Sequence, residues 1–252
     1  MDKQLPNGIA LSWGLGKPSS RGPKREMSLK QIVDTAVSIA DKDGLAAVSM
    51  NRVAKSLGFT AMSLYRYIPS KDDLIILMQD AISDLSIPLE KAEHGWREAM
   101  EAFVQATIDV YKEHPWFLET PIYGVPMTPN ALKVVDWALG GLQHVPLEDS
   151  EKMAVILLLS SYARACGILQ KDMARAMQLG SPPDAFSGKG YADTLASLVT
   201  PERFPYLHSV VASGAYTDEN QSSEDAGDDI EFGLKRILDG IEQYLKKKKE
   251  QT

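Results

Sequence analysis

The stretch SMNRVAKSLGFTAMSLYRYIPSK, residues 49–71, decides how the N-terminal quarter of this chain folds. It is typical of two short helices that meet at a tight turn, with Gly58 in the turn and the small Ala54 where the helices approach closely. This pattern predicts a helix-turn-helix, whose second helix enters the major groove of DNA. The expected inward side chains are Val53, Leu57, Leu64 and Ile68. The expected outer face of the second helix holds Thr60, Ser63, Tyr65, Arg66 and Tyr67.

The segments on either side of this motif complete a recognisable order. An amphipathic helix is predicted over residues 29–42 and ends at Asp43-Gly44, and another begins at Ser70, which has capping-box spacing to Asp73. Residues 28–75 resemble the DNA-binding domain of the TetR family of transcriptional repressors. A weaker resemblance to the ligand-binding half of tetracycline-repressor-like members continues through GWREAMEAF (95–103), EHPWFLETPI (113–122) and FGLKRILDGIEQYL (232–245).

The resemblance implies a repressor that binds a palindromic operator as a homodimer and leaves it when a small-molecule effector binds. The positions that face bases in the family match Asn51, Ala61, Met62 and Tyr65. The positions that face phosphates match Ser49, Ser63, Arg66, Tyr67 and Lys71. An alternative for the two tyrosines is that they pack in the core rather than contact DNA.

We expect an all-α fold, because no segment alternates with the period of a strand. Three regions are predicted: a flexible basic arm (1–27), the helix-turn-helix domain (28–75), and a larger helical domain for effector binding and dimerisation (76–252). The helices expected after the helix-turn-helix lie at 71–85, 95–114, 129–143, 147–179 and 228–248, with loops at 180–190 and 214–229. The run 153–159 is apolar on every side, so it needs cover. In the family, dimers form through helices that match 147–179 and 228–248.

The N-terminal arm carries scattered basic residues and several Pro and Gly residues. We interpret it either as a basic arm that follows the DNA backbone or as a disordered leader. Trp13 is unusual in such a segment and indicates that part of the arm packs back on the protein. The basic residues are Lys17, Arg21, Lys24 and Arg25.

Charge is divided unevenly along the chain. Residues 1–75 hold 11 Lys and Arg against 7 Asp and Glu, although the whole chain has a net charge of −7. Because screening limits electrostatics to about 8–10 Å, a local basic excess is enough for contact with phosphates. The four lysines at 246–249 suit the negative end of a helix dipole, with a nucleic-acid tail as the alternative. No secretory leader is present, and the apolar run 153–159 is too short to span a bilayer, so we expect a cytoplasmic protein.

A small-molecule site is expected among aromatic and polar side chains of the second domain. A small-molecule site typically has a few polar groups in an otherwise apolar cavity. Aromatic side chains on helices, however, more often belong to the core. Arg164, which follows the most apolar stretch, is either a ligand contact or a satisfied buried group. The candidate effector contacts are Phe103, Thr107, Trp116, Asn130, Trp137, Tyr162 and Arg164.

The sequence predicts neither a metal nor a cofactor. Tetracycline repressors hold drug-bound magnesium with a His that has no counterpart in LETPIYGVPMT (118–128), and the four His residues lack metal-ligand spacing. Cys166 is interpreted as a small core residue, with a redox sensor as the alternative. Two other function classes compete with the repressor. An enzyme is not favoured, because no hydrolase elbow, zincin pair or complete phosphate loop is present. A helical interaction module that keeps the motif only for packing conflicts with its outward Tyr65 and Arg66.

Overall fold

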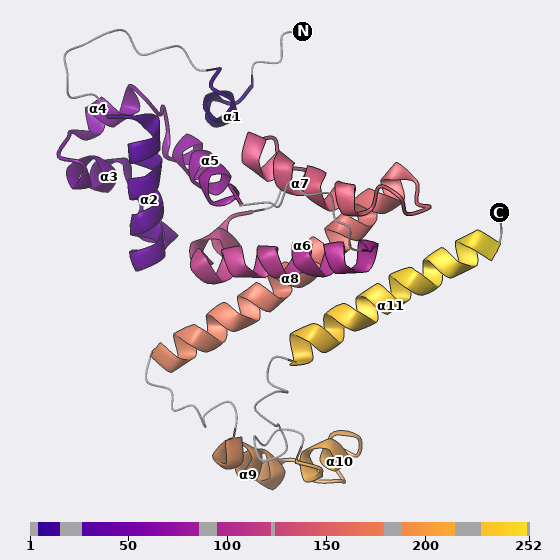
Figure 1. The fold of residues 1–252 in the computed structure, drawn as a ribbon. Helices are drawn as coiled ribbons and strands as arrows, with labels where there is room; N and C mark the ends of the chain where they lie inside the picture. The colour runs from indigo at the N-terminus through magenta and orange to yellow at the C-terminus, as the bar shows by residue number, and fades with distance from the viewer. Residues whose placement is uncertain are drawn as a thin grey trace. The chain divides into compact units, whose positions relative to one another are not determined.

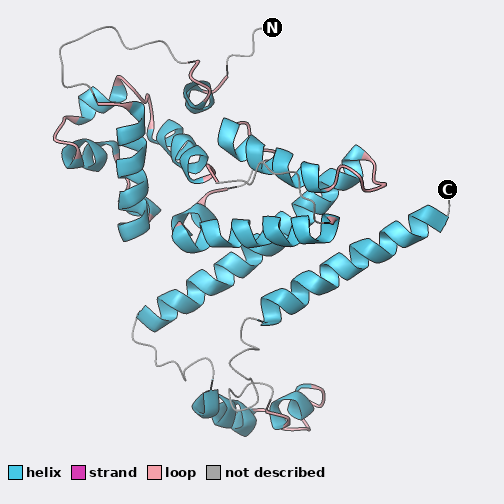
Figure 2. Ribbon diagram, in the orientation of Figure 1, coloured by secondary structure: helices cyan, strands magenta, loops and turns pink. Residues whose placement is uncertain are grey.

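The computed structural model describes residues 5–15, 27–85, 95–121, 124–178, 188–214 and 228–250, and all regular structure in these ranges is helical (Figures 1 and 2). This confirms the predicted all-α fold. The chain divides into two compact units, residues 1–167 and 168–252. The domain boundary predicted at residue 75 lies inside helix α5 (Lys71–Ile82). This helix packs against α1, α2 and α7, which all belong to the first unit.

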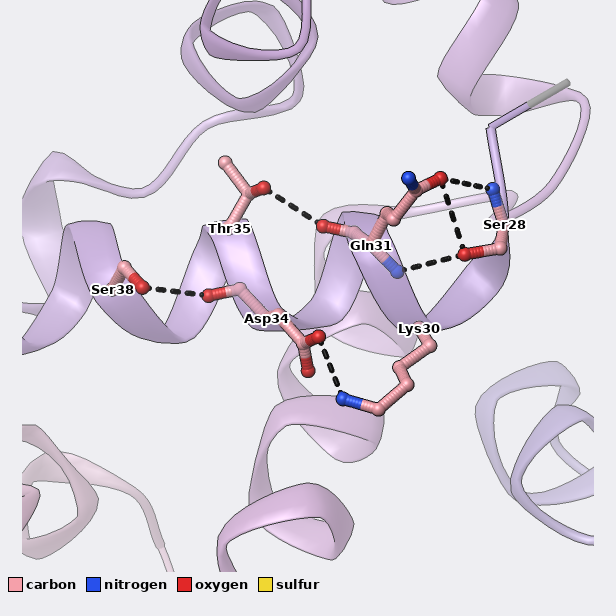
Figure 3. A network of polar contacts seen from close by, with 6 residues as sticks. All are labelled: Ser28, Lys30, Gln31, Asp34, Thr35 and Ser38. Carbon is pink, nitrogen blue, oxygen red and sulfur yellow. Dashed lines mark hydrogen bonds and ion pairs between the residues drawn. The ribbon is translucent and has the colours of Figure 1, made fainter. Parts of the chain in front are cut away.

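The first helix of the DNA-binding motif, α2 (Leu29–Asp43), begins at a complete capping box. The hydroxyl of Ser28 accepts a hydrogen bond from Gln31 N at 3.1 Å, and Gln31 Oε1 accepts one from Ser28 N at 2.9 Å (Figure 3). Two backbone donors at the helix start are therefore satisfied by side chains. The helix ends at Gly44, whose φ of +80° is a conformation that few other residues adopt.

The helix-turn-helix follows a 3-10 turn, η1 (Leu45–Ala47), and consists of α3 (Met50–Ser56) and α4 (Ala61–Tyr65). Ser49 caps α3 by accepting from Arg52 N, and Thr60 caps α4 by accepting from Ser63 N. Gly58 has a φ of +77° between them, as the turn requires. The predicted helix-turn-helix is confirmed, with its turn at Gly58.

We refer to helices α2 to α5 as the head. Its core is continuous and closed, and the predicted inward residues Val53, Leu64 and Ile68 are fully buried in it, with Leu57 packed at its edge. The buried cluster includes Ile32, Val33, Ala36, Val48, Val53, Ala54, Leu64, Ile68, Leu74, Met78 and Trp116.

The predicted flexible arm contains a short helix, α1 (Asn7–Ser12), that packs on α5. The expectation of flexibility is therefore wrong for residues 5–15, because Ile9 is buried and Leu11 packs against the head core. Trp13 does pack back: its indole N–H donates to the carbonyl of Met127 at 2.8 Å. The basic residues of the arm, from 17 to 25, lie outside the described residues.

The rest of the first unit is built from α6 (Trp96–Glu113), the 3-10 helix η2 (Pro115–Glu119), α7 (Pro129–Gly141) and α8 (Asp149–Gln178), which continues into the second unit. Helix α6 packs against α7 and η2, and α7 also contacts α5. Gly141 allows the close approach of α6 and α7, since a Cβ atom there would lie 2.7 Å from the Cβ of Ala99. These packings join the head to the helices that follow it.

The second unit contains the end of α8 together with α9 (Gly188–Leu198), α10 (Leu207–Ala212) and α11 (Asp228–Glu250). Helices α9 and α10 contact each other and were not predicted. Most of the loops predicted at 180–190 and 214–229 lie outside the described residues, although α9 begins within the first of them.

Helix α8 is, between Asp149 and Ala176, long and apolar enough to span a bilayer by length and composition alone. The apolar run 153–159 is only part of it. A core helix of a water-soluble protein passes the same test, and Lys152, Arg164 and Lys171 interrupt this one. The feature is therefore weak evidence for a membrane span.

Candidate nucleic-acid interface and effector region

The outer face of α4 presents the predicted base-facing side chains to solvent. Met62 is 74% exposed and Tyr65 is 46% exposed, whereas Leu64 on the inner face is completely buried. Ala61 is half-buried at the start of the helix, and Asn51 is exposed near the start of α3. Core packing is therefore not the role of Tyr65, and its ring is free to contact a neighbouring molecule.

The hydroxyl groups expected at phosphates also stabilise the helix starts. Ser49 Oγ accepts from Arg52 N at 3.2 Å, and Ser63 Oγ lies 3.0 Å from Thr60 Oγ1. A hydroxyl group that accepts from a backbone amide can still donate its own proton to a phosphate oxygen. The cap fixes Ser49 at the start of α3, and Ser63 is held by its contact with Thr60, the cap of α4.

The remaining predicted contacts differ in burial. Arg66 is exposed and Lys71, at the first position of α5, is half-buried. Tyr67 is half-buried and packs against the head core, so the alternative role in packing applies to part of this side chain.

Two further side chains near the motif were not among the predicted contacts. Phe59, in the turn before α4, is 37% exposed, although its apolar type suggested an inward position. Arg52 of α3 is exposed and forms an ion pair with Asp43 at the end of α2. Its charge is therefore partly neutralised within the head.

In the expected effector region, Phe103 of α6 and Trp137 of α7 form an edge-to-face pair with ring centroids 6.2 Å apart. Phe103 is buried and Trp137 is half-buried. Thr107 is half-buried one turn further along α6, and its hydroxyl donates to the carbonyl of Phe103 at 2.8 Å. The structure thus brings these three predicted residues together on facing helices.

Arg164 of α8 is a satisfied group that fixes the end of η2. Its guanidinium donates to the carbonyl oxygens of Leu118 at 2.6 Å and Thr120 at 3.0 Å, and it also bonds the Tyr111 hydroxyl. Burial raises the pKa of Tyr111 above its ordinary value, and the nearby positive charge of Arg164 opposes that rise. Tyr162 is half-buried on the same helix.

Two predicted effector contacts have other partners in the structure. Trp116 is buried in the head core, and its indole N–H donates to Asp41 Oδ1 at 2.7 Å, so its surface is not available to a ligand. The same carboxylate oxygen lies 2.8 Å from His114 Nδ1. Asn130 donates its backbone N–H to Asp80 Oδ1 at 2.8 Å and its side-chain amide to the Asp80 carbonyl. Both residues therefore join the head to η2 or α7.

Comparison with known families agrees with this geometry. The family described as "Bacterial regulatory proteins, tetR family" matches residues 32–78, which contain the helix-turn-helix. The family described as "Tetracyclin repressor-like, C-terminal domain" matches residues 87–245, more than half of the chain. The chain belongs to the TetR family. It is a helix-turn-helix transcriptional regulator of that family, as the resemblance at residues 28–75 predicted.

Relatives of this TetR-family protein include a named repressor. The HTH-type transcriptional repressor DrrR1 of Streptomyces coeruleorubidus is 36% identical over 243 residues, which cover 93% of this chain and 84% of that protein. Among solved structures, apo ActR from Streptomyces coelicolor has a TM-score of 0.69 at 24% identity and covers 89% of this chain and 99% of its own. ActR in complex with actinorhodin has a TM-score of 0.69 at 25% identity, with 88% and 99% covered. The name of DrrR1 supports a transcriptional repressor of the TetR family.

Proposed function

We propose that this TetR-family protein is a cytoplasmic repressor that binds a palindromic operator as a homodimer and is released by a small, mainly apolar effector. The observation that carries the proposal is the outward face of α4. Met62 and Tyr65 are exposed on a helix whose inner face is closed by Leu64. A recognition helix needs one exposed face and one buried face, because the side chains that read bases must project from the protein into the groove.

The chemistry of this face favours apolar readout. Met62 and Ala61 carry no hydrogen-bonding group, so their expected contacts are thymine methyl groups, while Asn51 can pair with the edge of an adenine. Arg66 and Lys71 add positive charge for phosphates, and these contacts carry no sequence information. We therefore expect affinity to fall steeply as salt rises.

A homodimer is supported by exposed apolar side chains on α8. Leu157 is 65% exposed, and Leu158, Ile168, Leu169 and Met173 are also exposed. Positions 157 and 168, like 158 and 169, are eleven residues apart and share a helix face, so these side chains form one stripe. A second copy of the chain, meeting it through residues 147–179 and 228–248, would cover this stripe.

The proposed effector site lies by the Phe103–Trp137 pair between α6 and α7. Aromatic rings on facing helices and the nearby Thr107 hydroxyl suit a ligand that is mostly apolar with one polar group. Support for ligand binding in this fold comes from ActR, which was solved in complex with actinorhodin. Effector binding would favour a conformation of the helices after α5 in which the two heads of the dimer no longer match successive major grooves. The protein would then release DNA.

Selection from a randomised duplex library tests the DNA-binding part of the proposal. The expected product is an inverted repeat whose half-site centres are separated by about one helical turn, roughly 34 Å, or a multiple of it. Recovery of duplexes without a repeated half-site would contradict the dimeric mode.

The effector part is tested with actinorhodin as the probe. Isothermal titration measures its binding, and fluorescence anisotropy measures operator release at the same concentrations. The expected result is saturable binding that Phe103→Ala weakens, with loss of operator affinity in the wild type. Binding that leaves operator affinity unchanged would contradict release but not the site. If the probe does not bind, the Phe103–Trp137 site is not one for this class of compound.

A further inference from the structure

The N-terminal helix α1 lies closer to α5 than a helix with larger side chains could. A Cβ atom added at Gly8 would lie 3.0 Å from the Cα of Asp73, 3.1 Å from its carbonyl oxygen and 3.1 Å from the Cβ of Ile76. Any larger residue at this position would press on the α5 backbone and force a shift. The contact is therefore specified by the sequence of α1 and is not a loose association.

A buried hydrogen bond fixes α1 on α5. The backbone N–H of Gly8 donates to Asp73 Oδ1 at 2.6 Å, between residues 65 apart in the chain. Asp73 lies in the first turn of α5, where its other carboxylate oxygen accepts from the Ser70 hydroxyl. Because Ser70 caps α5, α1 is attached directly at the helix start that follows the recognition helix.

The other end of α1 reaches the segment before α7. The helix ends at Ser12, and Gly14 beyond it has a φ of +67°. Gly14 N donates to the Leu11 carbonyl and Leu15 N donates to the Ala10 carbonyl. These two bonds form a Schellman cap, which stops the helix at a defined residue. Trp13 therefore leaves the helix at a fixed place, and its indole N–H donates to the carbonyl of Met127 at 2.8 Å.

A second attachment joins the same two regions directly. Asp80, near the end of α5, accepts from the backbone N–H and the side-chain amide of Asn130 at the start of α7. Helix α5 is thus tied to the start of α7 at two points: by Asp80–Asn130 and by α1, which bridges Asp73 and Met127. One tie leaves a helix free to swing about it, whereas two ties fix its direction.

We propose that residues 7–13, the N-terminal strap, are positioning residues that set the angle of α5 relative to α7 and so fix where the recognition helix lies in each subunit. This inference rests on the proposed binding of a dimer to two half-sites. Both heads must be placed correctly to bind a palindrome, but one head binds a single half-site at any angle. If the strap is released, only a fraction of molecules has both heads in place, and the apparent dissociation constant for the palindrome rises by the inverse of that fraction.

The test compares duplexes with two half-sites at the selected spacing, at spacings one base pair longer and shorter, and with one half-site. Gly8→Val drives a branched side chain into the α5 backbone and should detach the strap. We expect it to lower affinity for the selected palindrome about tenfold and single half-site affinity less than about twofold. It should also flatten the preference for the selected spacing. Gly140→Val is the matched control, because a Cβ at that helical glycine meets nothing within 4 Å.

A milder variant keeps the inference testable if Gly8→Val does not fold by circular dichroism. Trp13→Phe keeps an aromatic ring at this position but is smaller and lacks the indole N–H that donates to Met127, so we expect the same pattern with about a threefold loss for the palindrome. A general loss of stability would instead lower the affinity for every duplex alike. Unchanged spacing profiles in the folded variants would overturn the role of the strap. If the wild type itself shows no spacing preference, the proposed binding to two half-sites fails instead.

Discussion

The head and helix α8 differ in how far their apolar side chains are buried. In the head, Ile32, Leu64 and Ile68 are completely buried by the chain itself. In α8, Ile156 and Leu159 are buried, but their neighbours Leu157 and Leu158 are 65% and 48% exposed. The sequence predicted that 153–159 needs cover on every side, and Leu157 and Leu158 on this run are exposed.

This difference indicates that the core of the head closes without a partner. A closed apolar core makes the fold of the head depend on contacts within one chain. A contiguous apolar stripe on a helix surface is characteristic of a site where another molecule binds. Substitutions in the two regions should therefore be distinguished by whether their effects depend on protein concentration.

The largest effect is expected from Leu157→Glu. A carboxylate placed at a subunit contact loses its water without gaining a partner, so we expect the dimer to weaken about a hundredfold or more. Sedimentation velocity over a concentration series measures this. Leu198→Glu in α9 is the matched control, because Leu198 is 63% exposed and receives the same change. An unaltered dimer in Leu157→Glu would place the interface elsewhere.

Leu64→Ala tests the other side of the comparison. Removing a fully buried leucine from a closed core should lower the free energy of unfolding by about 2–5 kcal/mol. Urea unfolding followed by circular dichroism is the measurement, and the loss should be independent of protein concentration. A loss below about 1 kcal/mol would mean that the head core collapses around the cavity or is less closed than the burial indicates.

Tyr65→Ala separates DNA contact from head stability. Because the ring is exposed, the unfolding transition should stay in place, while affinity for the selected operator should fall by about 1–3 kcal/mol. Fluorescence anisotropy measures the affinity for the operator and for a scrambled duplex, and urea unfolding measures the stability. Tyr206→Ala, at a fully solvated tyrosine of the second unit, should change neither. Normal operator affinity in Tyr65→Ala would show that the base-facing side of α4 is misplaced.

The smallest effect is expected from Lys71→Ala. A phosphate contact carries no base information, so specific and non-specific binding should weaken to a similar degree, and the slope of log affinity against log salt should become shallower by about one. Lys249→Ala, near the end of α11, serves as the charge control. A selective loss for the operator alone would mean that Lys71 reads sequence.

The head could be predicted in detail because its signals are local. The helix start at Ser70 and the turn at Gly58 were predicted, because both signals lie within short windows of sequence. The caps at Ser28 and Ser49 are equally local, although neither residue was predicted as a cap. The helices at 95–114 and 129–143 were found from their apolar spacing, and the structure has them as α6 and α7.

The attachments between segments could not be predicted because their partners are far apart in the chain. Trp116 meets Asp41 75 residues away, and Asn130 meets Asp80 50 residues away. In sequence, a tryptophan on a helix is more often a core residue than a ligand contact, but the sequence does not show which core it joins. Helix α1 is only six residues long and depends on α5, so its own periodicity carries too little signal.

The carboxylates that make these attachments share a property with a practical consequence. Asp73 accepts from the backbone amide of Gly8, and Asp80 accepts from that of Asn130, so the donor in both bonds is uncharged. Dissolved ions act mainly on pairs of exposed charges, so salt has little to screen at these joints. Binding to DNA, in contrast, weakens steeply with salt through counterion release. Raising the ionic strength should therefore detach the protein from DNA without breaking these two joints.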